Sequence, residues 1–197
     1  MTAGPGVSVA KRVFDIAGAA LALLLLSPLL LFVALRIKLD SPGPVFFRQP
    51  RVGRHGVPFA IRKFRTMTHG ATGLEITVGA DPRITRVGAW LRRTRIDELP
   101  QFFNVLGGSM SLVGPRPERP YFVETLTRQV PYYAVRQSVK PGVTGWAQVR
   151  YHYGSTVEES AEKLQYDLYY VKNHTLFLDL VVLFETVGVV LLAKGSR

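Results

Sequence analysis

The longest apolar pattern lies near the N-terminus, where residues 16–35 read IAGAALALLLLSPLLLFVAL. Asp15 is the only charged residue in positions 13–35. A continuous helix of 20 residues is about 30 Å long, which matches the hydrocarbon thickness of a bilayer. The pattern therefore predicts a membrane-associated helix over residues 9–39, preceded by a disordered tail over residues 1–8.

Two features of this apolar segment bear on how it would meet the membrane. Ser27-Pro28 lies near its middle, and proline removes a helical hydrogen bond, so a bend is expected there. Basic residues flank both ends, and cations prefer the cytoplasmic face. These features favour a re-entrant helix that enters and leaves on one side. A spanning helix with a tolerated proline is an equal alternative, and a buried helix of a soluble protein is less favoured because both faces are apolar. The flanking residues are Lys11, Arg12, Arg36 and Lys38.

The remaining chain has shorter patterns, which predict a mainly helical α+β fold with one small β element in a compact domain over residues 40–197. A basic amphipathic helix at 84–95 carries Trp90 at its boundary and is typical of a membrane interface or of an ordinary surface. A second apolar run at 176–193 contains Asp179, which would make a crossing costly, so we expect it to pack at the interface or in the core. The other expected elements are strands at 45–48 and 58–64 around a turn at 51–56, a loop at 66–82, and helices at 100–106 and 158–173.

Composition narrows the function of the chain. Its 197 residues carry a net charge of +11 and no cysteine. Without cysteine the chain has no disulfide, no cysteine-ligated metal and no thiol nucleophile. The basic excess indicates an anionic partner such as a substrate phosphate, a lipid headgroup or a nucleic acid. A nucleic-acid-binding module would leave the apolar segment unexplained, and a non-catalytic membrane scaffold would leave the acidic pair described next unexplained.

The candidate catalytic residues are Asp97 and Glu98, two acids inside the most basic part of the chain. Pro100 is typical of a first helical turn, so Asp97 would lie at or just before a helix N-terminus. There the helix dipole and nearby cations would keep its carboxylate ionised. An ionised aspartate can act as a covalent nucleophile, and Mg²⁺ binds one or two carboxylates together with substrate phosphates. The structural alternative is an N-capping acid beside a surface ion pair.

A candidate phosphate-binding segment follows at residues 107–117, GGSMSLVGPRP. Arg116 stands between two prolines on a stiff backbone, and a pre-oriented arginine suits bidentate binding of phosphate. The sequence contains no Walker loop, no GxGxxG and no HExxH motif, and its four histidines are dispersed.

Several strings along the chain closely resemble one family. They are KRVFDIAGAALALLLLSP, PVFFRQPRVG, IRKFRTM, DPRITRVGAWLRRTRIDELPQFFNVLGGSMSLVGPRPERP, KPGVTGWAQV and YDLYYVKNHTLFLDL. In this order they resemble the bacterial sugar transferases, the monotopic polyprenyl-phosphate phosphoglycosyl transferases, over about residues 9–194. IDELPQ followed by SLVGPRP is the most specific part of this match.

The resemblance implies an enzyme that transfers a sugar 1-phosphate from a UDP-sugar to undecaprenyl phosphate, releases UMP and starts the assembly of exopolysaccharide, O-antigen or another glycan. It implies a monotopic protein on the cytoplasmic face of the bacterial inner membrane, in contact with phospholipid and not with nucleic acid. A homodimer is one assembly that it allows. Many relatives with this downstream sequence carry a multi-span region before it, so the chain is expected to be either a short form or a catalytic domain.

The resemblance also assigns residues by position. Asp97 matches the nucleophile, Glu98 matches its partner in holding Mg²⁺, with Mn²⁺ as the alternative ion, and both are expected metal ligands. Ser27 and Pro28 match the break in the re-entrant helix. After GWAQV the chain departs from smaller family members, with Arg150-Tyr-His152 in place of Asn-Gly-Arg. The expected substrate-binding residues are Arg92, Arg116, Lys63, Arg65, Arg150 and His152.

Overall fold

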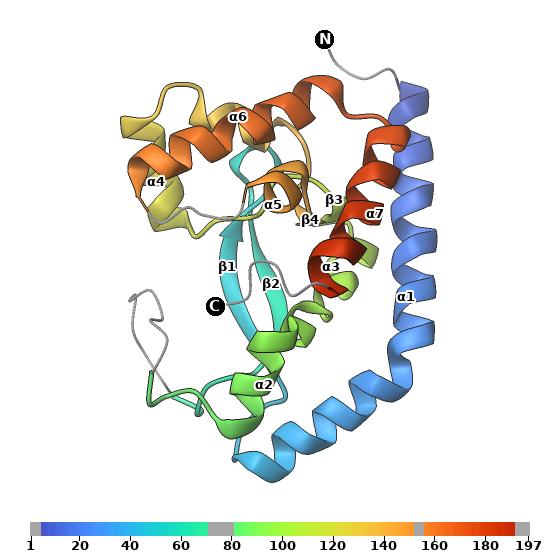
Figure 1. The fold of residues 1–197 in the computed structure, drawn as a ribbon, viewed down its shortest axis with the longest axis vertical. Helices are drawn as coiled ribbons and strands as arrows, with labels where there is room; N and C mark the ends of the chain where they lie inside the picture. The colour runs from blue at the N-terminus through green and yellow to red at the C-terminus, as the bar shows by residue number, and fades with distance from the viewer. Residues whose placement is uncertain (1–4, 71–80, 152–155, 192–197) are drawn as a thin grey trace.

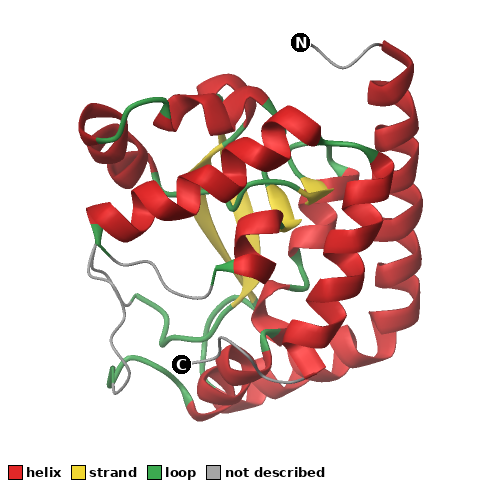
Figure 2. Cartoon of the chain, turned by 45° about the horizontal axis from the view of Figure 1, so that its top comes forward, coloured by secondary structure: helices red, strands yellow, loops and turns green. Residues whose placement is uncertain are grey.

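The computed structural model describes residues 5–70, 81–151 and 156–191. These residues form a mainly helical α+β domain with a long N-terminal helix along one side (Figure 1). This agrees with the predicted fold class. Figure 2 shows helices around a small group of strands at the centre of the molecule.

Helix α1 comprises Pro5–Asp40, so it begins inside the segment expected to be a tail. Pro28 lies within it, and Figure 1 shows the helix changing direction in its middle. Proline donates no backbone hydrogen bond and clashes with the preceding turn, which accounts for the predicted bend. The Ser27 hydroxyl donates to the Leu24 carbonyl oxygen at 2.8 Å. Among the described residues, α1 is the one helix long and apolar enough to cross a membrane.

Both limbs of α1 pack on the rest of the domain. Ala19, before the bend, belongs to a buried cluster that also contains Val105 and Leu112. Val33 and Ile37, after the bend, belong to a second buried cluster with two residues of other elements, Phe64 and Leu91. The opposite face of the helix is exposed and apolar. Its most exposed side chains include Leu24, Leu25, Leu31, Phe32, Leu35 and Leu39.

The described strands form two small sheets rather than the single β element expected. In the first, β1 (Phe46–Val52) pairs antiparallel with β2 (Pro58–Phe64). The short 3-10 helix η1 (Arg54–Gly56) connects them at the predicted turn, and His55 adopts a left-handed φ of 57° there. In the second sheet, β3 (Ser111–Val113) pairs in parallel with β4 (Gly142–Thr144). Three-residue strands carry too short an alternation to be seen in the sequence.

Helices surround these sheets. The predicted helices correspond to α2 (Arg86–Thr94), α3 (Gln101–Leu106), α6 (Val157–Asn173) and α7 (Leu176–Leu191). The elements that the sequence did not reveal are the 3-10 helices η2 (Ile96–Glu98) and η3 (Tyr133–Ser138), and the helices α4 (Pro120–Gln129) and α5 (Trp146–Arg150). Part of the predicted loop at 66–82 lies outside the described residues.

A buried ionic network joins α1 to α7 and β3. The Lys11 ammonium lies 3.0 Å from Asp15 Oδ1 and 2.9 Å from Asp179 Oδ2. It also donates to the Ser111 hydroxyl at 2.6 Å, and the Tyr170 hydroxyl donates to Asp179 at 2.7 Å. Asp179 is therefore a buried partner of α1, which agrees with the expectation that the second apolar run packs at the interface or in the core.

Candidate active site

The acidic pair lies on a sharp turn between two helices. Arg95 ends α2 in a left-handed conformation with φ 60°, and η2 follows at once with Asp97 and Glu98. Pro100 precedes the first residue of α3. Asp97 thus lies just before a helix start, as predicted, but in a separate 3-10 turn.

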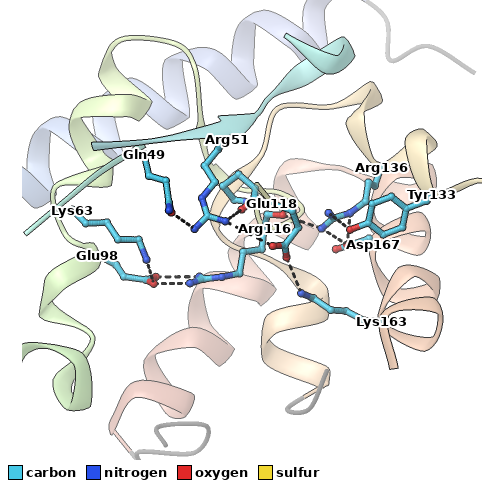
Figure 3. A network of polar contacts seen from close by, with 11 residues as sticks. Gln49, Arg51, Lys63, Glu98, Arg116, Glu118, Tyr133, Arg136, Lys163 and Asp167 are labelled. Carbon is cyan, nitrogen blue, oxygen red and sulfur yellow. Dashed lines mark hydrogen bonds and ion pairs between the residues drawn. The ribbon is translucent and has the colours of Figure 1, made fainter. Parts of the chain in front are cut away.

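Glu98 is held by two cations from other elements (Figure 3). Lys63 on β2 lies with its ammonium 2.7 Å from Glu98 Oε1. Arg116 donates in parallel to both carboxylate oxygens, with Nη2–Oε1 at 2.6 Å and Nη1–Oε2 at 3.1 Å. Burial acts to raise the pKa of Glu98, but the adjacent charges of Arg116 and Lys63 outweigh it, and the pKa lies well below the usual glutamate value. Glu98 is therefore a fixed anion that orients two cations.

Asp97 is buried but unpaired. Among the described residues, its carboxylate has no hydrogen bond or ion pair with another side chain, and it retains 8% exposure. Burial and the charge of Glu98 raise the pKa of Asp97. The cations Lys63, Arg116 and Arg92 oppose this rise without cancelling it. The pKa of Asp97 is thus shifted opposite to the direction that nearby cations alone would give, because desolvation is the larger effect. That its carboxylate is ionised stays a prediction.

Arg92 approaches Asp97 from α2. Its Nε donates to the Thr66 hydroxyl at 2.9 Å, and its charge acts on the Asp97 carboxylate. Thr66 can lie close to α2 because Gly88 on that helix has no side chain. A Cβ at Gly88 would be 2.0 Å from the Thr66 carbonyl oxygen. The structure thus brings Asp97, Glu98, Lys63, Arg92 and Arg116 together, and these five residues form the charge cluster of the site.

Arg116 belongs to a short segment without regular secondary structure that we call the strap, residues 115–118. Two prolines flank Arg116, so the strap has few backbone donors of its own and a restricted backbone. It follows β3 directly, and the backbone N–H of Gly114 donates to the Thr144 carbonyl oxygen at 2.9 Å. The parallel pairing of β3 and β4 therefore determines where the strap begins.

Two of the expected substrate-binding residues, Arg65 and Arg150, do not join the charge cluster. Arg65 is buried at the end of α1, where its guanidinium donates to the carbonyl oxygens of Ile37, Ser41 and Pro42. The structure thus assigns Arg65 to holding the C-terminus of the membrane helix. Arg150 pairs with Glu185 at 2.5 Å and lies over the Trp146 ring at 4.5 Å. His152 lies outside the described residues.

A second group of charged side chains lies behind the strap, and its ion pairs were not predicted from the sequence. Glu118 lies 3.4 Å from Lys163 and 3.8 Å from Arg51. Arg136 forms a buried ion pair with Asp167 at 2.7 Å. An acid on the apolar face of a predicted helix, as Asp167 is, indicates a buried partner, but only the folded chain identifies that partner as Arg136.

The donor set fits a divalent cation that is shared with a substrate. Asp97 and Glu98 are adjacent carboxylates. Asp97 has no side-chain partner among the described residues, whereas the Glu98 oxygens already accept hydrogen bonds from Lys63 and Arg116. Within the described ranges, no group of three or more acidic, histidine or cysteine side chains could hold a metal alone. Mg²⁺ commonly binds one or two carboxylates plus substrate phosphates and water, so these two residues suit it better than an ion that needs a complete protein cage.

Comparison with known proteins gives consistent relatives. The chain is 47% identical over 189 residues to UDP-N-acetylgalactosamine-undecaprenyl-phosphate N-acetylgalactosaminephosphotransferase of Aeromonas hydrophila, covering 95% of this chain and 45% of that protein. It is 45% identical over 181 residues to UDP-glucose:undecaprenyl-phosphate glucose-1-phosphate transferase of Escherichia coli strain K12, covering 90% and 39%. It is 47% identical over 190 residues to exopolysaccharide production protein PSS of Rhizobium leguminosarum bv. phaseoli, covering 91% and 94%.

The chain therefore spans less than half the length of the first two relatives and almost the whole of the third. The family described as "Bacterial sugar transferase" matches residues 7–193, which include the bent helix, the acidic pair, the strap and α7. Because this match extends over nearly the entire chain, the protein belongs to the bacterial sugar transferase family.

Proposed function

We propose that the chain transfers a sugar 1-phosphate from a UDP-sugar to undecaprenyl phosphate and releases UMP, through a covalent aspartyl phosphosugar. The observation that carries this proposal is the contrast within the acidic pair. Glu98 is tied to Lys63 and Arg116, whereas Asp97 beside it has no partner among the described side chains. A carboxylate among cations is suited to attack the phosphorus atom of a phosphoryl group, because the cations neutralise the negative charge on the phosphoryl oxygens.

In the first step, an Asp97 carboxylate oxygen attacks the β-phosphorus of the UDP-sugar. A bond forms between that oxygen and the phosphorus, and the bond from the β-phosphorus to the bridging oxygen breaks. UMP leaves with the electron pair of that bond. Arg116, Lys63 and Arg92 neutralise charge on the phosphoryl oxygens, which is the main requirement of phosphoryl transfer.

In the second step, a phosphate oxygen of undecaprenyl phosphate attacks the same phosphorus. The bond to Asp97 breaks, which regenerates the carboxylate and yields an undecaprenyl diphosphate sugar. Neither step needs a proton from a histidine, so the charge cluster supplies the groups that the reaction requires. The names of the relatives, which include undecaprenyl-phosphate transferases for glucose and N-acetylgalactosamine, support this substrate class.

Asp97 and Glu98 would hold Mg²⁺, or Mn²⁺ in its place. When bound, the ion supplies further charge neutralisation for the diphosphate. The orientation of the cluster does not depend on it, since Lys63 and Arg116 already hold Glu98 through direct contacts.

For the membrane arrangement, we propose that α1 is re-entrant from the cytoplasmic face of the bacterial inner membrane. Support comes from the packing of both limbs on the same domain, Ala19 before the bend and Val33 after it. A spanning helix would separate these contacts across the bilayer. The exposed apolar face of α1 would then contact lipid, next to the site where a lipid phosphate is needed. A homodimer is compatible with this arrangement.

The decisive experiment follows the covalent adduct. Purified protein in detergent is incubated with Mg²⁺ and a panel of UDP-sugars, and its intact mass is measured. We expect the mass of one phosphosugar on the wild type, loss of that adduct and of UMP release in Asp97→Asn, and no change in Glu124→Gln, an exposed control on α4. An adduct of full stoichiometry on Asp97→Asn would refute the assignment of the nucleophile.

A further inference from the structure

The strap is fastened by its carbonyl oxygens, one after another, to other parts of the domain. Four consecutive residues each have their carbonyl oxygen hydrogen-bonded to a different donor. Two of the donors are backbone N–H groups and two are arginine side chains. The bonds are Gly142 N to Pro115 at 3.0 Å, Arg136 Nη2 to Arg116 at 2.9 Å, Arg51 Nη1 to Pro117 at 3.3 Å and Val52 N to Glu118 at 3.0 Å.

The contact at the Arg116 carbonyl differs from the others because its donor is itself oriented by buried groups. Arg136 lies in η3 and is 5% exposed. Its Nε and Nη2 lie 2.9 and 2.7 Å from Asp167 Oδ2, and its Nη1 donates to the Tyr133 hydroxyl at 3.1 Å. The guanidinium also lies over the Tyr133 ring, 5.1 Å from its centroid. In a planar guanidinium fixed on these sides, the second N–H of Nη2 can point in one direction only, toward the Arg116 carbonyl oxygen.

Arg116 is thus held from two ends (Figure 3). Its side chain points forward to Glu98 with two hydrogen bonds, and its carbonyl oxygen is bound from behind by Arg136. The carbonyl group and the side chain of Arg116 are bonded to the same Cα atom. A backbone movement that displaces the carbonyl oxygen therefore also displaces the side chain. The residues on either side are prolines, which lack the N–H groups that could otherwise hold the strap.

We propose that Arg136, oriented by Asp167 and Tyr133, is a positioning residue that holds the Arg116 guanidinium in register with the acidic pair. This role rests on the proposed function, in which Arg116 neutralises phosphoryl charge. Arg136 acts through the Arg116 backbone and touches no substrate. A displacement of about 1 Å at a catalytic group can lower a rate by about a hundredfold, so the positioning contact has a measurable consequence.

The first test uses Arg136→Lys, which keeps the charge but loses the planar fork. Hydrogen–deuterium exchange of the Val52 and Gly142 amides, which donate to carbonyl oxygens of the strap, is measured without any substrate and is called strap exchange. We expect faster strap exchange in Arg136→Lys, and a smaller increase in Tyr133→Phe, which removes a single hydroxyl and keeps the ring. Arg128→Lys, an exposed arginine paired with Glu124 on α4, is the matched control and should match the wild type. Unchanged exchange in both variants would refute the proposal.

The second test asks whether Arg136 acts through Arg116. In the UMP-release assay, we expect Arg136→Lys to lower kcat by roughly 10-fold or more, at equal folded fraction. In an Arg116→Lys background, the same change should cost less than about twofold, because the side chain that it positions is already altered. If Arg136→Lys lowers kcat by the same factor in the Arg116→Lys background as in the wild type, Arg136 acts independently of Arg116 and the proposal is overturned.

The two tests also separate this inference from the proposed function. A wild type that releases no UMP from any UDP-sugar would contradict the proposed function, while the exchange measurement would still decide the role of Arg136. An active wild type with strap exchange that Arg136→Lys leaves unchanged would contradict the positioning role alone.

Discussion

Arg116 and Glu98 form a bidentate ion pair, with Nη2–Oε1 at 2.6 Å and Nη1–Oε2 at 3.1 Å. Lys63 on β2 approaches the same Oε1 atom at 2.7 Å. Glu98 thus joins the strap to β2 and keeps both cations beside Asp97, whose carboxylate has no side-chain partner in the described part of the chain. In the proposed function, Glu98 therefore orients the two cations and Asp97 is the nucleophile.

The geometry of this pair predicts the outcome of Arg116→Lys. Lysine keeps the charge but cannot make two parallel hydrogen bonds to one carboxylate. A hydrogen bond to a charged group contributes about 1.5–3 kcal/mol, so we expect kcat/KM for UMP release to fall roughly 10- to 100-fold. Arg128→Lys should retain full activity. A similar loss in Arg128→Lys would mean that the assay reports general sensitivity to arginine replacement.

A pH dependence of stability is expected from Glu118. Burial acts to raise the pKa of Glu118, but Lys163, Arg136 and other cations outweigh it, so the pKa is lower in the folded state than in the unfolded chain. A lowered carboxyl pKa stabilises the fold above the unfolded pKa of about 4.5, and this stabilisation is lost as the pH falls through the folded pKa. The Tm difference between the wild type and Glu118→Gln should therefore be largest near neutral pH and shrink below about pH 4.5. A difference that grows on acidification would contradict this sign.

The Lys11 network predicts how α1 depends on α7. Lys11→Met leaves Asp179 buried without its cation, and breaking a buried pair typically costs about 3–5 kcal/mol. We expect a clear fall in Tm in detergent and faster proteolysis between α1 and the domain. The double variant Lys11→Met with Asp179→Leu should recover part of this loss, because it removes the buried Asp179 charge, while Asp15 keeps its hydrogen bonds from the Ser111 hydroxyl and the Leu112 N–H. Equal destabilisation in the single and double variants would show that the pair is not the cause.

The cysteine-free sequence allows a direct test of the topology of α1. Single cysteines replace Val9 and Leu39, two exposed positions before and after the bend. With a re-entrant helix, a membrane-impermeant maleimide should label both from the same side of oriented vesicles. In a Pro28→Ala background, a straighter helix is expected, and labelling of one end from each side becomes the predicted result. Opposite labelling in the Pro28-containing protein would refute the re-entrant arrangement.

Much of the local structure could be predicted from the pattern of residues. The apolar run, the strand at 58–64 and the helices that became α2, α3, α6 and α7 all match within a few residues. These elements carry their own periodicity or a proline that marks their start, so they depend mainly on nearby residues. The strands β3 and β4 were missed because three residues have no useful period and their pairing joins segments about thirty positions apart.

The charge cluster, too, could be predicted from the sequence only in part. Residue type and motif alone marked Asp97, Glu98 and Arg116 as candidate site residues, because acids within a basic segment and an arginine between prolines are local features. Which cation holds which acid was decided by tertiary structure. Arg65 and Arg92 lie in similar basic surroundings in the sequence, yet Arg65 binds the end of α1 whereas Arg92 approaches Asp97. Desolvation, which raises the pKa of Asp97, and the contact from Arg136 to the strap both arise from packing between distant elements, and no local pattern contains that information.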